Sequence, residues 1–203
     1  MITANHDAFL DPRYRMIAEG HDLSGRSDLW VDPQGLERRP ITNGGMLNPT
    51  PYVIRRGTEL YRYADASKSP WQNLGSPWWI ERRDLDLILS VARRHQTSER
   101  LVSRLLLVMP PEWGAKLDLL VKVRVDRDLK AYRGLGKSAW ADARDGGPVT
   151  RIEPRNENAN LRIHQLYIPG VRSLETWGPS GRHEVYYTLL GTWRVHGASW
   201  IHV

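Results

Sequence analysis

One glutamate, Glu184, stands at the start of the most regular alternating segment of the chain, where its carboxylate could do chemistry. The residues that follow it, 185–190, alternate in the way typical of a strand with one face in a core. A Gly191-Thr192 break before residues 193–195 predicts two short strands joined by a turn. A carboxylate held rigidly at a strand start can act as an acid or stabilise positive charge in a cleft. The alternative is a solvated residue with no such role.

The segment 181–195, GRHEVYYTLLGTWRV, resembles the last motif of mono-ADP-ribosyltransferase toxins, in which a catalytic Glu precedes an apolar strand. The resemblance implies that Glu184 hydrogen-bonds the nicotinamide ribose of NAD and supports an oxocarbenium-like transition state. Arginine-specific members carry Glu two positions earlier, and guanine-modifying members carry Gln. Here Arg182 occupies this acceptor-side position, so an arginine acceptor is disfavoured. Water, nucleic acid and other side chains stay open as acceptors.

Two earlier segments extend the resemblance, which covers roughly residues 53 to 200. The run Glu59-Leu60-Tyr61-Arg62 is similar to the family's first core strand, whose Arg binds the NAD diphosphate and ribose side. The resemblance implies that Arg62 and Tyr61 bind NAD, and a planar guanidinium suits a diphosphate because it binds two oxygens at once. A surface arginine on an edge strand is the alternative.

The run Ser76-Pro77-Trp78-Trp79-Ile80 is similar to the family's middle motif. The resemblance places Ser76 in the NAD site and implies that Trp78 or Trp79 stacks on the nicotinamide, while the other Trp is buried in the core. The sequence departs from the family here, because the usual Ser-Thr-Ser is missing.

Composition limits the class of protein. The 203 residues are 40% hydrophobic and 26% charged, which predicts one domain, at most with an extension. We expect no membrane span, because no apolar run approaches 18 residues, and no signal peptide, because the N-terminus lacks the apolar region of one. Zero cysteines exclude disulfides and thiolate catalysis. The seven histidines show no metal-binding spacing, and Tyr187 stands where a zinc-protease motif needs its second His, so we expect no metal.

The charge balance favours an anionic partner. The formal net charge is +6, and the nine Trp and eight Tyr far outnumber the one Phe. Basic residues and wet aromatic rings suit nucleic acid, a phosphorylated ligand, or an acidic protein such as a neutralising immunity factor. A disulfide-free chain also suits a secreted or translocated effector that is delivered unfolded and acts in the cytoplasm of a target cell.

Local patterns predict a loop-rich N-terminal arm over residues 1–50, with one short helix near 14–18, and a catalytic domain over 51–203. Apolar spacing predicts a helix over 85–94 with Asp84 as its N-cap, and a second short helix from Thr97. The expected strands and strand pairs are 53–64, 121–125 and 161–168, together with the pair after Glu184. Residues 134–160 are rich in Gly, Asp and Asn and predict a long loop.

Few helices among many alternating strands indicate an α+β fold. The resemblance implies an ADP-ribosyltransferase-like split β core, mixed but mainly antiparallel, with flanking helices. A rival motif, AYRGLGKS at 131–138, fits a relaxed phosphate-binding P-loop. A P-loop needs a buried strand before it and a helix after it, and neither is predicted here.

The leading hypothesis is therefore an NAD-dependent ADP-ribosyltransferase toxin or effector that transfers ADP-ribose to a macromolecular target and releases nicotinamide. One alternative is an NAD glycohydrolase on the same fold, in which water is the acceptor. The other is a non-catalytic nucleic-acid-binding β domain, in which Lys and Arg contact phosphates and Trp and Tyr stack on bases.

Overall fold

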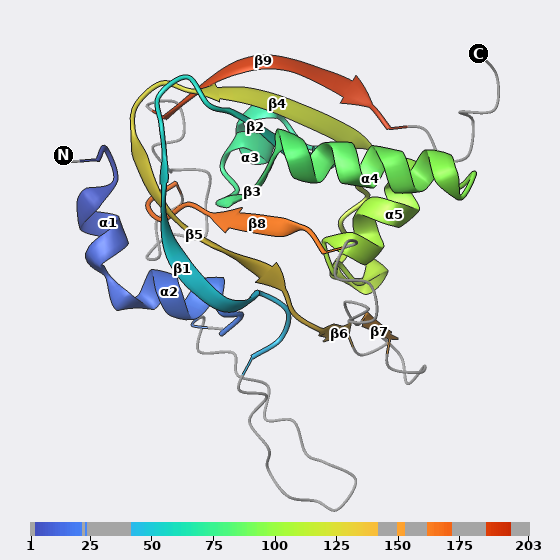
Figure 1. The fold of residues 1–203 in the computed structure, drawn as a ribbon, viewed down its shortest axis with the longest axis horizontal. Coiled ribbons are helices and arrows are strands. Elements are labelled where there is room, and N and C mark those ends of the chain that lie inside the picture. Colours follow the sequence, from blue (N-terminus) through green and yellow to red (C-terminus); the bar gives the residue numbers. More distant parts are fainter. Residues whose placement is uncertain are drawn as a thin grey trace, which may run out of the picture.

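A β-sheet with helices on its faces forms the body of the protein (Figure 1). The computed structural model describes residues 3–21, 23, 42–141, 150–152, 162–171 and 186–195. Its helices are α1 (His6–Leu10), α2 (Pro12–Ala18), α3 (Pro70–Leu74), α4 (Arg82–Arg94), α5 (Glu99–Leu106) and the 3₁₀ turn η1 (Pro111–Trp113). Its strands are β1 (Met46–Ile54), β2 (Glu59–Ala64), β3 (Trp78–Glu81), β4 (Leu119–Val125), β5 (Leu129–Gly136), β6 (Ala139–Ala141), β7 (Thr150–Ile152), β8 (His164–Tyr167) and β9 (Tyr187–Arg194). No helix among the described residues has the length and apolar character that crossing a membrane requires.

Seven strands form one sheet in the order β1-β5-β8-β3-β2-β4-β9, and β6 and β7 form a separate pair. The α+β class is confirmed. The expectation of a mainly antiparallel sheet is confirmed, but the expected mixture with parallel strands was wrong for the described strands, because each of their pairings is antiparallel. The long loop expected over 134–160 was also partly wrong, since it contains the end of β5 and both short strands. Residues 142–149 and 153–160 of that loop lie outside the described residues.

Strand alternation sorts side chains into cores on the two faces of the sheet. Val121, Val123 and Val125 of β4 are buried together with Trp79 and residues of β1, β2, β5 and β8, as the alternating pattern predicts. On the other face, Tyr61 and Tyr63 pack with Ile80 and the apolar sides of α4 and α5. Figure 1 shows α4 and α5 lying together on this side of the sheet, and α1 and α2 at the opposite end beside β1.

The helix expected over 85–94 is confirmed as α4, but its predicted N-cap was wrong. Asp84 is the third residue of the helix, and Glu81 stands at the N-cap position. The Asp84 side chain is buried, and its Oδ1 accepts a hydrogen bond of 2.8 Å from the backbone N–H of His164. The Asp84 carboxylate therefore binds a backbone N–H of β8 and does not cap its own helix. The second helix, α5, starts two residues after Thr97, with Ser98 as its N-cap.

The described part of the N-terminal arm packs on the sheet. Asn5 is buried, and its side chain donates to the carbonyls of Lys130 and Pro169 and accepts from the Lys130 N–H, at 2.8 to 3.0 Å. The helix expected near 14–18 is confirmed as α2, and the unexpected α1 precedes it. Strand β1 starts at Met46, so the boundary expected at residue 50 falls inside a strand.

The turn expected at Gly191-Thr192 was wrong, because β9 runs from Tyr187 to Arg194 and pairs with β4 on both sides of a register shift between Lys122 and Val123. Gly191 faces Lys122 in this ladder. A Cβ at Gly191 would lie 2.9 Å from the indole of Trp193. The glycine therefore makes room for a tryptophan that lies over its own strand.

Residues 131–138 do not form a P-loop. They run along β5 as far as Gly136 and lead into β6 without a helix. The described residues that follow this Gly-rich segment therefore offer no helix N-terminus to bind a phosphate.

Candidate functional site

The sheet opens between β2 and β3. These strands pair at only two positions, where Leu60 faces Glu81 and Tyr61 faces Ile80. Beyond this point β3 leaves β2 and pairs with β8 through Trp78 and Trp79. Strands β2 and β3 therefore separate where the segments predicted to bind NAD lie.

A cavity of about 1090 Å³ lies at this opening. Its wall includes residues of β2 and β3, the ends of α2 and α5, and the segments around Asn43 and η1. The lining residues are Ile17, Gly20, His21, Asn43, Gly45, Tyr61, Arg62, Tyr63, Ser76, Trp78, Trp79, Ile80, Leu107, Val108, Met109, Trp113 and Gln165. All five residues expected to bind NAD are among them. The expected catalytic Glu184 and acceptor-side Arg182 lie outside the described residues.

Arg62 is positioned by the short helix α3. Its Nη1 donates a hydrogen bond of 2.8 Å to the backbone carbonyl of Asn73. Asn73 is buried, and its Nδ2 donates to the carbonyl of Asp65 at 2.9 Å, which ties α3 to the end of β2. Helix α3 starts with a capping box formed by Ser69 and Gln72, so its position is fixed locally. The half-buried guanidinium is thus held at the wall of the cavity.

The two tryptophans of β3 have different surroundings. Trp79 is buried, with its Nε1 donating 3.0 Å to the carbonyl of Ser76 and its ring centroid 5.1 Å from that of Tyr187. Trp78 is only half-buried and meets Tyr167 edge to face at 5.0 Å. Ring surface for a ligand is therefore available on Trp78, whereas Trp79 acts as the floor of the site.

Two tyrosines of β2 connect the cavity to carboxylates behind it. The Tyr61 hydroxyl donates 2.9 Å to Glu59, which also pairs with Lys122 at 2.7 Å. The Lys122 hydrogen bond holds the pKa of Glu59 below its usual value. The Tyr63 hydroxyl donates to buried Glu99 at 2.5 Å. Burial raises the pKa of both Tyr63 and Glu99, so this pair favours its protonated forms.

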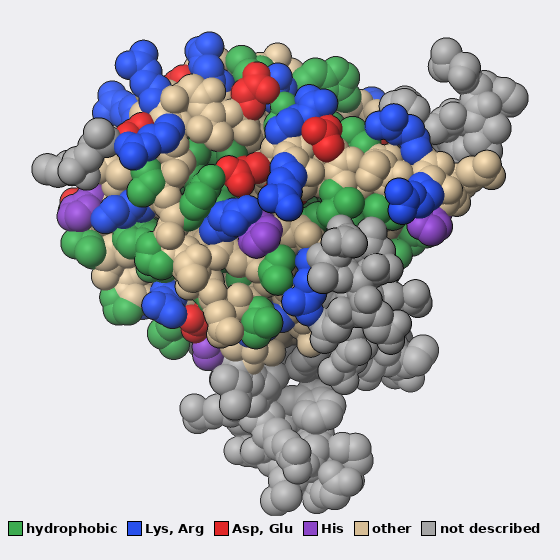
Figure 2. All heavy atoms as spheres, viewed as in Figure 1, with side chains coloured by type: hydrophobic (Ala, Val, Ile, Leu, Met, Phe, Trp, Pro, Cys, Tyr) green, Lys and Arg blue, Asp and Glu red, His purple; other side chains and the backbone are tan. Residues whose placement is uncertain are grey.

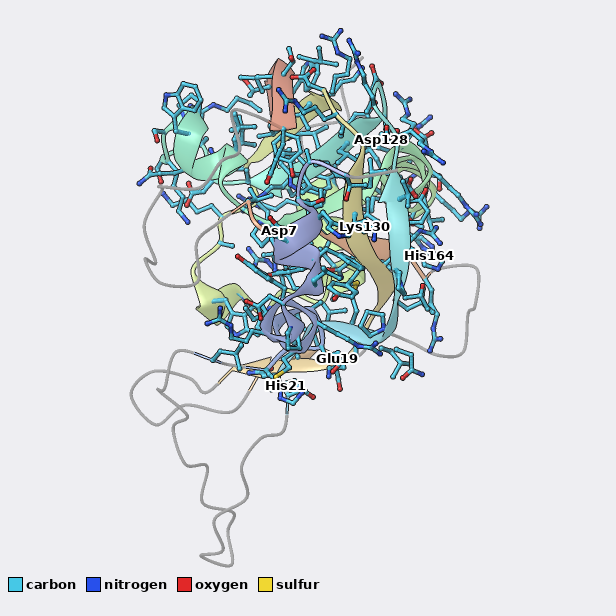
Figure 3. All side chains as sticks on the ribbon, turned by 90° about the vertical axis from the view of Figure 1, so that its left-hand side faces the viewer. Asp7, Glu19, His21, Asp128, Lys130 and His164 are labelled. Atoms are coloured by element: carbon cyan, nitrogen blue, oxygen red, sulfur yellow. The ribbon has the colours of Figure 1, made fainter. Side chains whose placement is uncertain are left out.

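Several residues of the cavity lining could not be predicted from local sequence patterns. The segments that contain His21, Asn43 and Gln165 are far apart in sequence, and tertiary contacts bring each of them to the cavity. Gln165 is held by a hydrogen bond of 3.1 Å from its Nε2 to the carbonyl of Leu107. His21 lies 3.9 Å from Glu19 at the end of α2, and Figure 3 shows this pair well apart from His164.

Trp113 also lines the cavity and remains 44% exposed. It lies over Gly44, where a Cβ would come within 2.9 Å of the indole. The loop that carries it is braced by Arg104, which donates to the carbonyls of Met109 and Ala115. An exposed indole on a braced loop can serve as a second surface for a planar ring.

The lining combines one guanidinium, indole and phenol rings, and amide and hydroxyl groups. No carboxylate is among the described lining residues, and no group of three or more His, Asp or Glu side chains in the described part of the chain could hold a metal ion. This composition suits an anionic ligand with planar rings.

No protein-family profile matches the chain, and no curated protein matches its sequence significantly. One solved structure that is similar is described as "Rhs1-CT in complex with cognate immunity protein RhsI1". It is 12% identical, with 73% of this chain and 83% of that chain covered and a TM-score of 0.38. A likeness at this level supports no conclusion about function.

Proposed function

We propose that the chain is an NAD-dependent ADP-ribosyltransferase of the toxin or effector kind, which releases nicotinamide and transfers ADP-ribose to a macromolecular target. One observation supports this more than any other. Tyr61 and Arg62 come from one predicted motif and Ser76, Trp78 and Trp79 from another, yet all five line a single cavity.

The chemistry of the wall fits NAD. Protein sites for small molecules commonly have volumes of about 300–1,000 Å³. The cavity, at about 1090 Å³, has room for a ligand as long as a dinucleotide. The Arg62 guanidinium can bind the diphosphate, and Trp78 offers ring surface to the nicotinamide. Trp113 is available to the second base.

In the proposed reaction, the C–N bond between nicotinamide and ribose breaks and the bonding pair leaves with nicotinamide. Positive charge develops on the ribose, and a carboxylate beside it stabilises that charge. We assign this role to Glu184, which precedes Tyr187 by three residues in sequence. The acceptor then attacks the ribose carbon and loses a proton. The aromatic contact between Tyr187 and Trp79 supports the assignment, because it joins the first residue of β9, three residues after Glu184 in sequence, to the cavity wall.

The test measures nicotinamide release from NAD by wild type and Glu184→Gln, in buffer and with RNA, protein or cell lysate added. We expect release that depends on an added macromolecule and falls at least about 100-fold in Glu184→Gln. Asp7→Asn, which alters an exposed carboxylate on α1 (Figure 3), is the matched control and should keep full activity. Glu184-dependent release in buffer alone would instead identify an NAD glycohydrolase. Absence of release under every condition would overturn both enzyme functions.

A further inference from the structure

The open face of β4 and β9 carries an exposed aromatic ring beside basic side chains. Trp193 pairs with Leu120, and two further positions along β4 on the same face are Lys122 and Arg124. The Trp193 indole is 49% exposed and lies over Gly191. From Leu120 to Arg124 the strand rises by roughly 13 Å, so the ring and both cations form one continuous row.

Helix α4, which packs on the same face of the sheet as Leu120, carries further exposed cations. Its solvent side exposes Arg82, Arg83, Arg93 and Arg94, with Asp86 as the acidic residue among them. Arg83 and Arg94 are eleven residues apart, which places them on the same side of the helix. Figure 2 shows Lys and Arg side chains over the upper half of the face on which α4 lies, with Asp and Glu side chains among them. We call Lys122, Arg124 and the four arginines of α4 the basic belt.

The belt keeps an excess of positive charge. Lys122 pairs with Glu59 at 2.7 Å and Arg82 with Asp86 at 2.9 Å, while Arg124 lies 3.7 Å from Asp126. Six cations therefore face three carboxylates, which leaves a net charge of +3. Among the described residues, Arg83, Arg93 and Arg94 make no salt bridge.

The belt also borders the cavity. The Tyr61 ring lines the cavity, and it has the Lys122 Nζ at 5.8 Å and the Arg82 guanidinium at 5.9 Å from its centroid. A polymer bound along the belt would therefore pass the mouth of the candidate site.

We propose that the basic belt and Trp193 form a binding surface for single-stranded nucleic acid. Arginine and lysine contact backbone phosphates, and the exposed indole stacks on a base, which is how such surfaces bind without strict sequence preference. An acidic protein would also use these cations, and poly-glutamate is therefore included in the test. That the bound strand also accepts ADP-ribose rests on the proposed function. The binding of the strand to the belt does not.

The test is fluorescence anisotropy of a labelled 20-nucleotide RNA or DNA, titrated with the full chain at several salt concentrations and without NAD. We expect the double variant Arg83→Ala/Arg94→Ala to reduce the slope of log K against log[salt] by about 1.4, since each phosphate contact contributes roughly 0.7 to that slope. The matched control removes two cations from α2, Arg13→Ala/Arg15→Ala, and should keep the wild-type slope. Trp193→Ala should weaken binding about 10-fold, and Trp193→Phe should restore most of it.

Equal losses in the belt and control variants would overturn the proposal, because binding would then follow net charge alone. Wild-type affinity in Trp193→Ala would contradict the stacking role. Binding of poly-glutamate through the same residues, with no binding of the oligonucleotide, would show an acidic-protein surface instead. Nicotinamide release is measured separately, so failure of this proposal and failure of the enzyme function are distinguishable.

Discussion

Tyr187, the first residue of β9, packs its ring 5.1 Å from that of Trp79 in β3, although β2 and β4 separate these two strands in the sheet. The contact crosses the core between the two halves of the sheet, where both rings are buried. It joins the strand that follows Glu184 to the floor of the cavity. The position of this strand and the shape of the candidate site are therefore coupled.

Loss of this ring contact should destabilise the fold. Tyr187→Ala removes a buried aromatic side chain and should lower the free energy of unfolding by about 3–5 kcal/mol. Tyr187→Phe keeps the ring, so it should destabilise the protein far less than Tyr187→Ala. Urea unfolding followed by tryptophan fluorescence measures both. Equal destabilisation by the two substitutions would show that the hydroxyl carries the effect.

Substitutions of the two tryptophans of β3 should have different effects, one on stability and the other on ligand binding. Trp79→Ala empties a buried site and should cost about 3–5 kcal/mol of unfolding free energy. Trp78→Ala removes a half-buried ring, so it should leave a folded protein that binds NAD at least about 10-fold more weakly. Thermal unfolding and NAD titration measure the two effects. Unchanged NAD affinity in folded Trp78→Ala would remove Trp78 from the site.

Arg62 should be sensitive even to lysine. Arg62→Lys keeps the charge but loses the planar fork, so NAD should bind about 10-fold more weakly, and Arg62→Ala should lose about 100-fold. The exposed Arg15→Ala on α2 is the control, with no expected effect on NAD. Isothermal titration with NAD and with nicotinamide alone checks the assignment. A loss that appears equally with nicotinamide would contradict a contact to the diphosphate.

Glu99 should make stability depend on pH. Burial raises its pKa above the ordinary value of 4.5, so the contribution of its neutral form is fully present below pH 4.5 and is lost as pH rises through the folded pKa. Glu99→Gln stays neutral and can still accept from Tyr63. Wild type should therefore lose stability relative to Glu99→Gln as pH rises from 4 to 8, which urea unfolding across pH measures. Tyr63→Phe removes the hydrogen bond that lowers the Glu99 pKa, and should carry the loss to higher pH.

The N-terminal arm should be required for full stability. Asn5→Ala leaves one buried backbone group of Pro169 and two partly buried groups of Lys130 without their partner, and should cost about 2–3 kcal/mol of unfolding free energy. Asp7→Ala, an exposed substitution on neighbouring α1, should change stability by less than about 0.5 kcal/mol. Denaturant unfolding of the full chain compares them. Matching midpoints would show that the Asn5 hydrogen bonds add nothing to stability.

Much of the local structure could be predicted from the sequence, because it depends on the periodicity of nearby residues. The alternation at Val121, Val123 and Val125 predicted β4, and apolar spacing predicted α4. Local patterns gave wrong predictions where the structure depends on a contact beyond the pattern itself. Asp84 looks like an N-cap, but it binds the backbone of His164, and Gly191 looks like a turn, but it makes room for Trp193 inside a strand.

The candidate site divides in the same way. The sequence by itself determined the residue types, with Arg62 after Tyr61 in one strand and paired tryptophans after Ser76 in another. Only the tertiary structure decided that these segments meet, because β3 leaves β2 after two residue pairs and opens the sheet between them. It also decided that His21, Trp113 and Gln165 complete the wall. The register between distant strands depends on contacts across the whole chain, and no local pattern of residues encodes it.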